Sequence, residues 1–320
     1  MSAAAEMEPM ALWCVAPGRS ELRPGKSGEG VLVETLYSGI SRGTERLVFD
    51  GRVPASESKR MSSLAQEGTF DFPVKYGYCA VGRVVEGDLA EQHVFALHPH
   101  QTSFRMAPAM LNVLPDGLPP ERAVLAANME TAMNVLWDSQ ASAGDRIVVI
   151  GAGVLGALAG YLAAKLPGSH VTLVDVNPSR AALASTLGCS FALPEDAPRE
   201  CDVVIHTSAT EQGLARALDC AGQEATIVEA SWFGSGQVSV PLGGAFHSRR
   251  LRIVGSQVGS LPASRVARWT HSRRMSTALG LLCDESLDAL VSGETAFADL
   301  PTHYGEILAD PDTLCHRIRY

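Results

Sequence analysis

A glycine turn in the middle of the chain has the residue types and spacing that bind a diphosphate. The stretch GAGVLG places Gly151, Gly153 and Gly156 in a G-x-G-x-x-G pattern. The run RIVVI before it predicts a buried strand, and the run ALAGYLAAKL after it predicts a helix. At such a junction Gly151 permits the tight turn, Gly153 lets the backbone approach a pyrophosphate, and Gly156 lets the helix pack on the strand. The N–H groups at the start of the helix would then hold the phosphates.

An acid follows the next predicted strand at the distance where an adenosine ribose would be recognised. The strand VTLVDV brings Asp175 to its end, about twenty residues beyond the turn. A carboxylate there accepts hydrogen bonds from ribose hydroxyls and repels a 2′-phosphate, which predicts NAD rather than NADP as the cofactor. The alternative is that the glycines serve packing and that Asp175 is a surface acid. We assign to the cofactor site Gly151, Gly153, Val154, Leu155, Gly156, Asp175, Arg180, Thr207, Ser231, Ser256 and Val258.

The elements around this turn predict an α/β protein with two domains. Residues 30–115 are rich in short apolar or alternating runs separated by Gly and Pro, which is typical of strands. From about Glu121 onward, helical and strand patterns alternate, and this predicts a parallel sheet with helices on both faces. The expected division is a Rossmann dinucleotide-binding domain over 123–260 and a β-rich domain over 1–122 plus 261–320.

A second polar stretch lies in the β-rich part of the chain. The residues GISRGTE, from Gly39 to Glu45, are too polar for a core strand and too irregular for a helix face. Gly39 and Gly43 can adopt backbone angles that other residues avoid. We therefore expect a shaped loop that presents side chains to a ligand.

The order of these motifs resembles the medium-chain dehydrogenase/reductase superfamily, which includes the zinc alcohol dehydrogenases. GISRGTE is similar to that family's GICGTD loop, and FPVKYGYCAVGRVVE is similar to its FPLVPGHEFAGVVVE stretch. The resemblance covers nearly the whole chain and implies a GroES-like catalytic domain for the β-rich part, a homodimer, and hydride transfer between an alcohol and a nicotinamide.

The departures from the family concern its catalytic zinc. Ser41 and Tyr78 stand where the resemblance places a zinc-binding cysteine and histidine, and Cys79 stands where the family has an acid. A hydroxyl and a phenol are poor zinc ligands beside a thiolate and an imidazole. Glu130 looks like the third ligand of the polyol-dehydrogenase branch. The combination of SGIS-x-GTE with GY also resembles the bacteriochlorophyllide dehydrogenase branch, so the resemblance implies a site without zinc.

Without a metal, a proton donor must act on the reacting oxygen, and the chain offers several candidates. The predicted catalytic residues are Tyr78, His98, Thr44 and Ser41. The predicted substrate-pocket residues are His100, Glu130 and Trp232. His98 and His100 could instead be loop histidines with ordinary hydrogen bonds, and Tyr78 could be packed in the barrel wall. A relocated metal site built from His98, His100, Glu130 and Cys79 remains an alternative.

Composition excludes several classes of function. The 35 acidic residues outnumber the 26 Lys and Arg, and no basic stripe invites nucleic acid or an anionic membrane. The seven cysteines show no C-x-x-C spacing, and their scattered, odd count favours a reducing cytoplasm over a disulfide framework. The uncharged run 147–164 is interpreted as strand, turn and helix rather than a membrane span. The start MSAAAEMEPM is not expected to be a signal peptide.

The leading hypothesis is a cytoplasmic, zinc-independent, NAD-dependent oxidoreductase that interconverts a small-molecule alcohol and a carbonyl. Two alternatives remain open. The first is an NADPH-dependent enoyl or quinone reductase of the same superfamily, and the second is a dinucleotide-binding sensor without catalysis. The arginines of RRMSTALGLL are interpreted as a solvated helix face, and Trp232 is expected to wall the pocket or to cap a loop.

Overall fold

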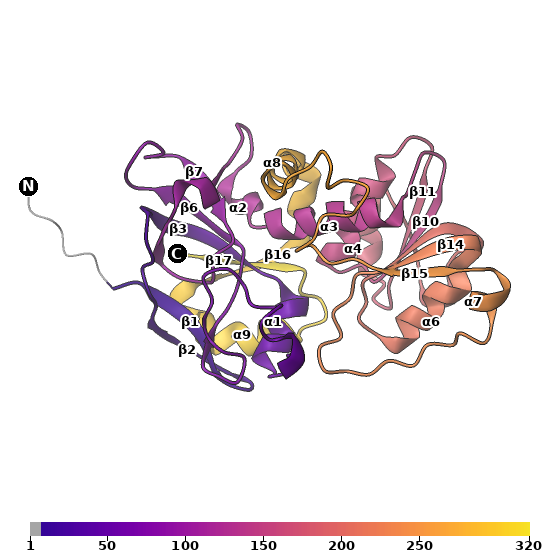
Figure 1. The fold of residues 1–320 in the computed structure, drawn as a ribbon, viewed down its shortest axis with the longest axis horizontal. Helices are drawn as coiled ribbons and strands as arrows, with labels where there is room; N and C mark the ends of the chain where they lie inside the picture. Colours follow the sequence, from indigo (N-terminus) through magenta and orange to yellow (C-terminus); the bar gives the residue numbers. More distant parts are fainter. Residues whose placement is uncertain (1–7) are drawn as a thin grey trace, which may run out of the picture. The chain divides into compact units, whose positions relative to one another are not determined.

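The computed structural model describes residues 8–320, and these residues form two compact units (Figure 1). Unit 1 runs to Ala127 and resumes over Val291–Tyr320, whereas unit 2 is Asn128–Leu290. The expectation that the chain starts without a signal peptide rests largely on residues 1–7, which lie outside the described residues. No helix within residues 8–320 is long and apolar enough to cross a membrane.

Unit 1 is built mainly from antiparallel strands. One sheet has the order β2-β1-β5-β4, and the other has the order β16-β17-β3-β6-β7-β9, with β8 paired to β3. Apolar side chains between these elements form two clusters, which bury Val33 and Val94 in one and Leu12 and Ile318 in the other. The strands of unit 1 are β1 (Met10–Ala16), β2 (Arg19–Pro24), β3 (Val31–Ile40), β4 (Glu67–Gly68), β5 (Val74–Lys75), β6 (Ala80–Val84), β7 (His93–Ala96), β8 (Ser103–Met106), β9 (Asn112–Val113), β16 (Val291–Ala296) and β17 (Cys315–Arg319). Its short helices are α1 (Arg42–Phe49), η1 (Ala55–Glu57), η2 (Pro108–Met110), α2 (Pro120–Ala123), η5 (Phe297–Asp299) and α9 (Leu300–Ala309).

Unit 2 is a doubly wound parallel sheet. Its strand order is β12-β11-β10-β13-β14-β15, and every neighbouring pair is parallel. Helices α6 and α7 lie on one side of this sheet and α4 lies on its other side (Figure 1). The strands of unit 2 are β10 (Arg146–Ile150), β11 (His170–Val174), β12 (Ser190–Ala192), β13 (Cys201–His206), β14 (Ala221–Glu229) and β15 (Arg252–Gly255). Its helices are α4 (Val154–Ala164), α5 (Arg180–Thr186), η3 (Pro194–Asp196), α6 (Glu211–Cys220), α7 (Ala245–Ser248), α8 (His271–Leu281) and η4 (Glu285–Leu290), and α3 (Ala126–Ser139) begins where unit 1 ends.

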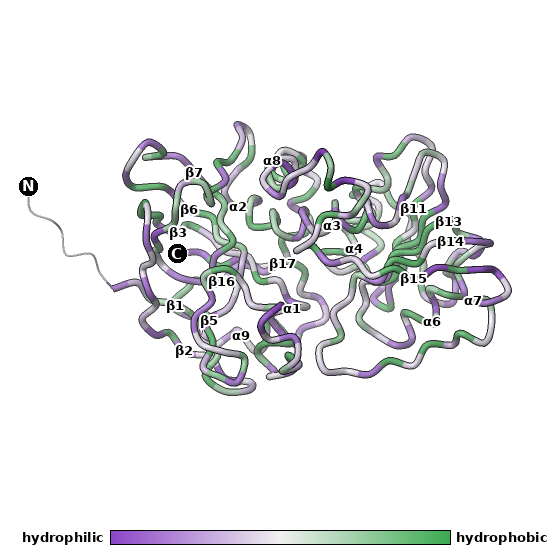
Figure 2. Tube along the Cα trace, viewed as in Figure 1, coloured by the Kyte–Doolittle hydropathy of each residue, from purple (hydrophilic) through white to green (hydrophobic). Residues whose placement is uncertain are grey.

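The apolar strands of the parallel sheet explain its burial. Figure 2 shows these strands as a continuous hydrophobic band, and Val148, Val149, Leu173, Val204 and Ile227 have no exposed surface. Strands covered by helices on both faces are hydrophobic throughout rather than alternating. The predicted α/β fold class, a Rossmann domain with a β-rich companion, is confirmed.

The second domain boundary lies thirty residues later than expected. Residues 261–290, which we expected with the β-rich domain, belong to unit 2. The reason is Arg274 of α8, which is 1% exposed and pairs with Glu130 of α3. The interpretation of the RRMSTALGLL arginines as a solvated face is therefore wrong for Arg274, although the neighbouring Arg273 is exposed.

The stretch GISRGTE also differs from the expected loop. Ser41 is the N-cap residue of α1, and Arg42 to Glu45 already belong to that helix. The Glu45 carboxylate reaches back to accept the N–H of Ser41 at 2.7 Å, which stabilises the start of the helix. Gly39 is needed for close packing, since a Cβ there would lie 2.9 Å from the carbonyl oxygen of Val124, whereas a Cβ on Gly43 would meet nothing within 4 Å.

Candidate active site

The glycine turn of unit 2 depends on the missing side chains of Gly151 and Gly156. Gly151 has φ +102°, and a Cβ on it would lie 2.8 Å from the backbone nitrogen of Ser208. A Cβ on Gly156 would overlap the carbonyl oxygen of Gly151, so α4 packs on β10 only because residue 156 has no side chain. Gly153 is exposed as the N-cap residue of α4, and a Cβ on it would meet nothing within 4 Å. The turn therefore offers open backbone at the start of a helix, where anions bind.

Asp175 lies directly after β11, beside this turn. Its Oδ2 accepts the N–H of Ala152 at 2.7 Å, and its Oδ1 accepts the N–H of Asn177 at 2.9 Å. A carboxylate has about four acceptor sites, so two remain for other donors such as ribose hydroxyls. The carboxylate thus joins the end of β11 to the turn and keeps its capacity to bind a ligand.

The other predicted cofactor residues also lie in unit 2, and two of them form hydrogen bonds with backbone groups of neighbouring segments. Thr207 donates its hydroxyl to the carbonyl of Gly151 at 2.8 Å, which fixes the turn from the end of β13. Ser231, after β14, accepts the N–H of Ala209 at 3.1 Å. Val154 and Leu155 form the partly buried first turn of α4.

Three predicted cofactor residues have roles in packing. Arg180 is 8% exposed at the start of α5. Ser256, just beyond β15, donates its hydroxyl to Asp138 at 2.6 Å, and the carbonyl of Val258 accepts a hydrogen bond from Arg274 at 2.6 Å. These contacts anchor the segment after β15 to α3 and α8.

In unit 1, three of the four predicted catalytic residues lie together. Tyr78 is partly buried and forms hydrogen bonds with the side chains of Ser41 and Thr44, at the start of α1. Burial raises the pKa of the Tyr78 hydroxyl well above its ordinary value of 10, and the hydrogen bonds from Ser41 and Thr44, which act in the opposite direction, do not offset it. Tyr78 therefore keeps its proton at neutral pH and is a neutral hydrogen-bonding group.

His98, the fourth predicted catalytic residue, has different surroundings from these three. It is 3% exposed, its ring stacks on Phe104 with centroids 4.0 Å apart, and its Nδ1–H donates to the carbonyl of Pro99 at 2.9 Å. Burial lowers the pKa of His98 to about 3, with Lys75 acting in the same direction. At neutral pH the single ring proton is thus held by Pro99, so the geometry disfavours His98 as a proton donor.

A buried polar network around Glu45 was not recognised from the sequence. Glu45 Oε2 accepts the Tyr304 hydroxyl at 2.7 Å and lies 2.9 Å from His100 Nε2. His100 Nδ1 lies 2.8 Å from Ser38 Oγ, which in turn lies 2.9 Å from the Tyr320 hydroxyl. Both His100 and Glu45 have fully buried side chains. The signal in the sequence is the acid following Thr44, but its partners His100 and Tyr304 come from the segment between β7 and β8 and from α9.

The two remaining predicted pocket residues belong to unit 2. Glu130 pairs with Arg274 at 2.9 Å, and burial raises its pKa although Arg274 acts in the opposite direction. Trp232 is partly buried in the segment after β14, at the carboxyl edge of the sheet. Glu130 is thus engaged by a cation, whereas Trp232 lies at the edge where parallel sheets bind ligands.

The residues of the relocated metal site do not form a ligand set. Within residues 8–320, no group of three or more His, Cys, Asp or Glu side chains is arranged to hold a metal ion. Burial raises the pKa of Cys79 well above its ordinary value of 9, with Glu45 acting in the same direction.

Comparison with known proteins agrees with this architecture. No family model matches the chain. D-guloside 3-dehydrogenase of Escherichia coli (strain K12) and that of Shigella flexneri are each 28% identical to it over 212 residues, which are 61% of this chain and 59% of each relative. The matched part thus spans about 59% of the length of these relatives.

Solved structures match nearly the whole chain. L-idonate 5-dehydrogenase from Escherichia coli has a TM-score of 0.77 and 14% identity, with 98% of both chains covered. Galactitol-1-phosphate dehydrogenase from Escherichia coli has a TM-score of 0.77 and 15% identity, with 97% of this chain and 100% of that chain covered. The chain has the fold of the medium-chain dehydrogenase/reductase superfamily.

Relatives of the medium-chain fold differ in the cofactor that they bind. A structure from Sinorhizobium meliloti, with a TM-score of 0.77, 18% identity and coverage of 98% of this chain and 99% of that chain, is bound to NADP. A structure described as a short chain alcohol dehydrogenase from Escherichia coli CFT073, with a TM-score of 0.77, 14% identity and coverage of 98% of this chain and 100% of that chain, is a complex with NADH. Solved structures with this fold therefore include complexes with either cofactor.

Proposed function

We propose that this protein is an NAD(H)-dependent oxidoreductase that interconverts an alcohol and a carbonyl without a catalytic metal. The observation that carries the proposal is the turn of unit 2. Gly151 adopts a positive φ, Gly156 has no room for a Cβ, and Asp175 binds the turn from the end of β11. These are the features that dinucleotide binding requires of such a junction. A bound nicotinamide would supply or accept the hydride.

The cofactor choice rests on the charge of Asp175. Its carboxylate is partly exposed and retains acceptor sites, so it suits the two ribose hydroxyls of NAD. A 2′-phosphate would meet an unfavourable negative charge at the same place. This supports NAD(H) over NADP(H), and it counts against the enoyl or quinone reductase alternative, which rests on NADPH.

The proton chemistry is proposed for Tyr78, Ser41 and Thr44. Tyr78 is held neutral by burial, and its phenol is hydrogen-bonded to two hydroxyls. Developing alkoxide charge is stabilised by hydrogen-bond donors aimed at the reacting oxygen. Tyr78 is therefore the proposed proton donor in carbonyl reduction, with Ser41 and Thr44 relaying the proton, and His98 is assigned a packing role.

The substrate class proposed is a secondary alcohol of a sugar or polyol, or the corresponding ketone. The names of the relatives are those of dehydrogenases of a guloside, an idonate and a galactitol phosphate. The alternative, a dinucleotide sensor, would bind NADH without consuming it. Incubation with NAD and a panel of such alcohols, with absorbance of NADH as the readout, separates the two.

Titration of Asp175→Ala with NADH and NADPH tests the cofactor assignment. Losing a charge-assisted hydrogen bond to the ribose costs about 1.5–3 kcal/mol, which corresponds to roughly 10- to 150-fold weaker NADH binding. Discrimination against NADPH should fall as well. Tighter binding of NADPH than of NADH by the unmodified protein would contradict the assignment.

Asp202→Ala is the matched control for this titration. Asp202 accepts the backbone N–H of Arg146 at 2.8 Å, which is the same kind of bond that Asp175 makes. Unlike Asp175, however, Asp202 lies at the amino ends of the strands. We expect Asp202→Ala to leave the affinity for NADH unchanged. Equal losses of affinity in both variants would indicate general damage to unit 2 rather than a lost ribose contact.

A further inference from the structure

Three side chains at the carboxyl ends of β13 and β14 are arranged as nucleophile, base and acid. The hydroxyl oxygen of Ser208 lies 2.7 Å from Nε2 of His206, and Nδ1 of His206 lies 2.6 Å from Oε2 of Glu229. His206 has no exposed surface, and Glu229 is 17% exposed at its side chain. The proposed oxidoreductase chemistry uses none of these groups, and they were not recognised from the sequence.

The Glu229 carboxylate determines which atoms donate and which accept in this group. The Glu229 carboxylate can only accept, so Nδ1 of His206 carries the proton and Nε2 is the acceptor for the Ser208 hydroxyl. The other carboxylate oxygen of Glu229 accepts the N–H of Ser231 at 2.8 Å, which holds the acid in place. The hydroxyl of Ser208 therefore points its proton at a base whose tautomer and orientation are fixed.

The backbone around Ser208 makes a sharp strand-to-helix turn. β13 ends at His206 and α6 begins at Glu211, and between them Ala209 has φ +51°, in the left-handed region that L residues rarely adopt. Thr210 is the N-cap residue of α6, and its hydroxyl lies 2.9 Å from Ser208 Oγ. Strain of this kind is retained where the surrounding structure requires the conformation. Nucleophilic serines of one large hydrolase class also lie on strand–turn–helix junctions.

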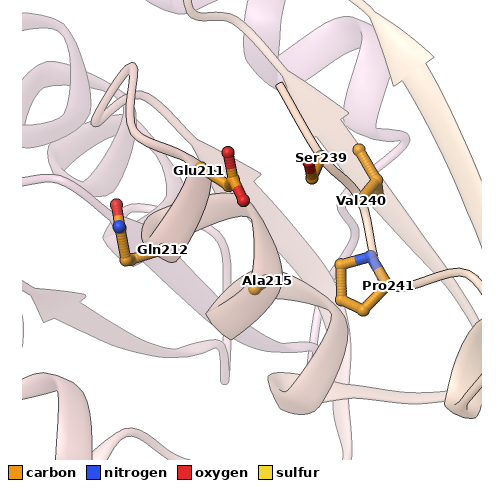
Figure 3. Close-up of a pocket in the computed structure, with 6 residues that line it drawn as sticks. All are labelled: Glu211, Gln212, Ala215, Ser239, Val240 and Pro241. Carbon is orange, nitrogen blue, oxygen red and sulfur yellow. The ribbon is translucent and has the colours of Figure 1, made fainter. Parts of the chain in front are cut away.

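The first turn of α6 lies beside Ser208. A Cβ on Gly213 of this turn would overlap Ser208 Oγ, and the N–H of Gly213 donates to Thr210 Oγ1 at 3.0 Å. The helix dipole favours negative charge at this end of α6. A separate cavity of about 370 Å³ has a lining that includes none of the three side chains of the group, and Figure 3 shows this lining, namely Glu211, Gln212, Ala215, Ser239, Val240 and Pro241.

We propose that Ser208 is the nucleophile of an acyl-transfer site that hydrolyses small carboxylic esters. His206 Nε2 takes the Ser208 proton as Oγ forms a bond to the ester carbonyl carbon, and the helix end faces the oxyanion. The ester C–O bond then breaks, the leaving alcohol takes the proton from His206, and an acyl-serine remains. Water, deprotonated by His206, attacks this acyl group, and the bond between the acyl carbon and Ser208 Oγ breaks. Ser208 Oγ takes the proton back from His206, and a carboxylic acid is released.

The test uses the full chain without any nicotinamide cofactor, so its result does not depend on the proposed oxidoreductase. The protein is incubated with an alkyl fluorophosphonate, which forms an Oγ–P bond to an activated serine and releases fluoride. Mass spectrometry should locate the label on Ser208, and Ser208→Ala should remain unlabelled. His206→Asn should slow labelling and p-nitrophenyl acetate hydrolysis about 10²- to 10³-fold, the range expected for loss of a general base.

Two controls keep the outcome interpretable. Ser62→Ala removes an exposed serine of unit 1, whose hydroxyl donates to the carbonyl of Ser58 at 2.8 Å, and this variant should label at the unmodified rate. Glu229→Gln removes the charge behind His206 with little change of shape, and it should slow labelling even if His206→Asn fails to fold. The proposal would be overturned if Ser208 carried no label or if another serine carried it. It would also be overturned if His206→Asn and Glu229→Gln both had the Tm of the unmodified protein and were labelled at its rate.

Discussion

Replacing Arg274 by methionine removes the cation that neutralises Glu130 inside unit 2. The Arg274 guanidinium donates Nε to Glu130 at 2.9 Å, one Nη to Asn134 at 2.6 Å, and the other to the carbonyl of Val258 at 2.6 Å. Its side chain is 2% exposed and that of Glu130 is 8% exposed. Methionine fills much of the same volume but satisfies none of the three acceptors.

The expected loss of stability follows from the buried charge that remains. Removing one partner of a buried ion pair typically costs about 3–5 kcal/mol, because the other charge is left uncompensated. For a domain the size of Asn128–Leu290, this corresponds to a fall in Tm of roughly 6–20 °C. Arg273→Met is the matched control, because Arg273 is exposed on the same turn of α8 and lies 4.0 Å over the Trp269 ring. We expect it to cost about 1 kcal/mol or less.

The loss should depend on pH with a definite sign. Burial already raises the pKa of Glu130 above 4.5 in the folded protein, and Arg274 is what restrains it. In Arg274→Met this restraint disappears, so the folded-state pKa rises further while the unfolded value stays near 4.5. A carboxyl group whose pKa is raised on folding stabilises the folded protein at pH values below its unfolded-state pKa. This contribution is lost as the pH rises through its folded-state pKa. The deficit of the variant relative to the unmodified protein should therefore be larger at pH 8 than at pH 5.

Chemical denaturation at pH 5 and pH 8 measures both effects. The double variant Glu130→Leu with Arg274→Met removes both charges and should recover part of the loss, since apolar replacements of buried pairs are often neutral. The reasoning is refuted if Arg274→Met unfolds within about 1 kcal/mol of the unmodified protein at pH 8. It is also refuted if the deficit is the same at both pH values.

Three further outcomes test the site. Gly156→Ala should cost about 1–3 kcal/mol of stability and abolish NADH binding in a titration, because its Cβ would overlap the Gly151 carbonyl, whereas Gly153→Ala should keep normal stability. Tyr78→Phe should lower turnover by about 10²- to 10⁴-fold while the NADH dissociation constant stays unchanged, and near-normal turnover would exclude it as the proton donor. Elemental analysis should find no stoichiometric zinc, because Ser41 and Tyr78 are poor ligands, and about one zinc per chain would contradict this.

The fold and the glycine turn could be predicted because their signals are local. RIVVI, GAGVLG and the following helix are adjacent in sequence, and each glycine has a requirement that the turn itself imposes. Gly151 needs a positive φ and Gly156 needs close packing, and both were expected from the spacing alone. The alternation of strands and helices is a short-range pattern of the same kind, and it predicts the parallel sheet.

The partners of buried charges could not be predicted, since they come from distant parts of the chain. Arg274 was interpreted as solvated because the sequence around it is polar, yet its acceptor Glu130 lies 144 residues earlier. Glu45 lies 259 residues before Tyr304, and His206 lies 23 residues before Glu229, on the neighbouring strand. The pattern of a single helix or strand contains no information about which charge packs against it. Such pairs require the tertiary structure.

Burial, reinforced by the Glu45 carboxylate, raises the pKa of the hydroxyl and thiol groups around Glu45. Burial raises the pKa of Cys14 and Cys315 to about 12, and the negative charge of Glu45 adds to this effect in both. It acts in the same direction on Cys79 and Tyr304. Neutral hydrogen-bond donors are therefore favoured over anionic groups in this part of unit 1. A site that acts through the hydroxyl groups of Tyr78, Ser41 and Thr44 suits these surroundings.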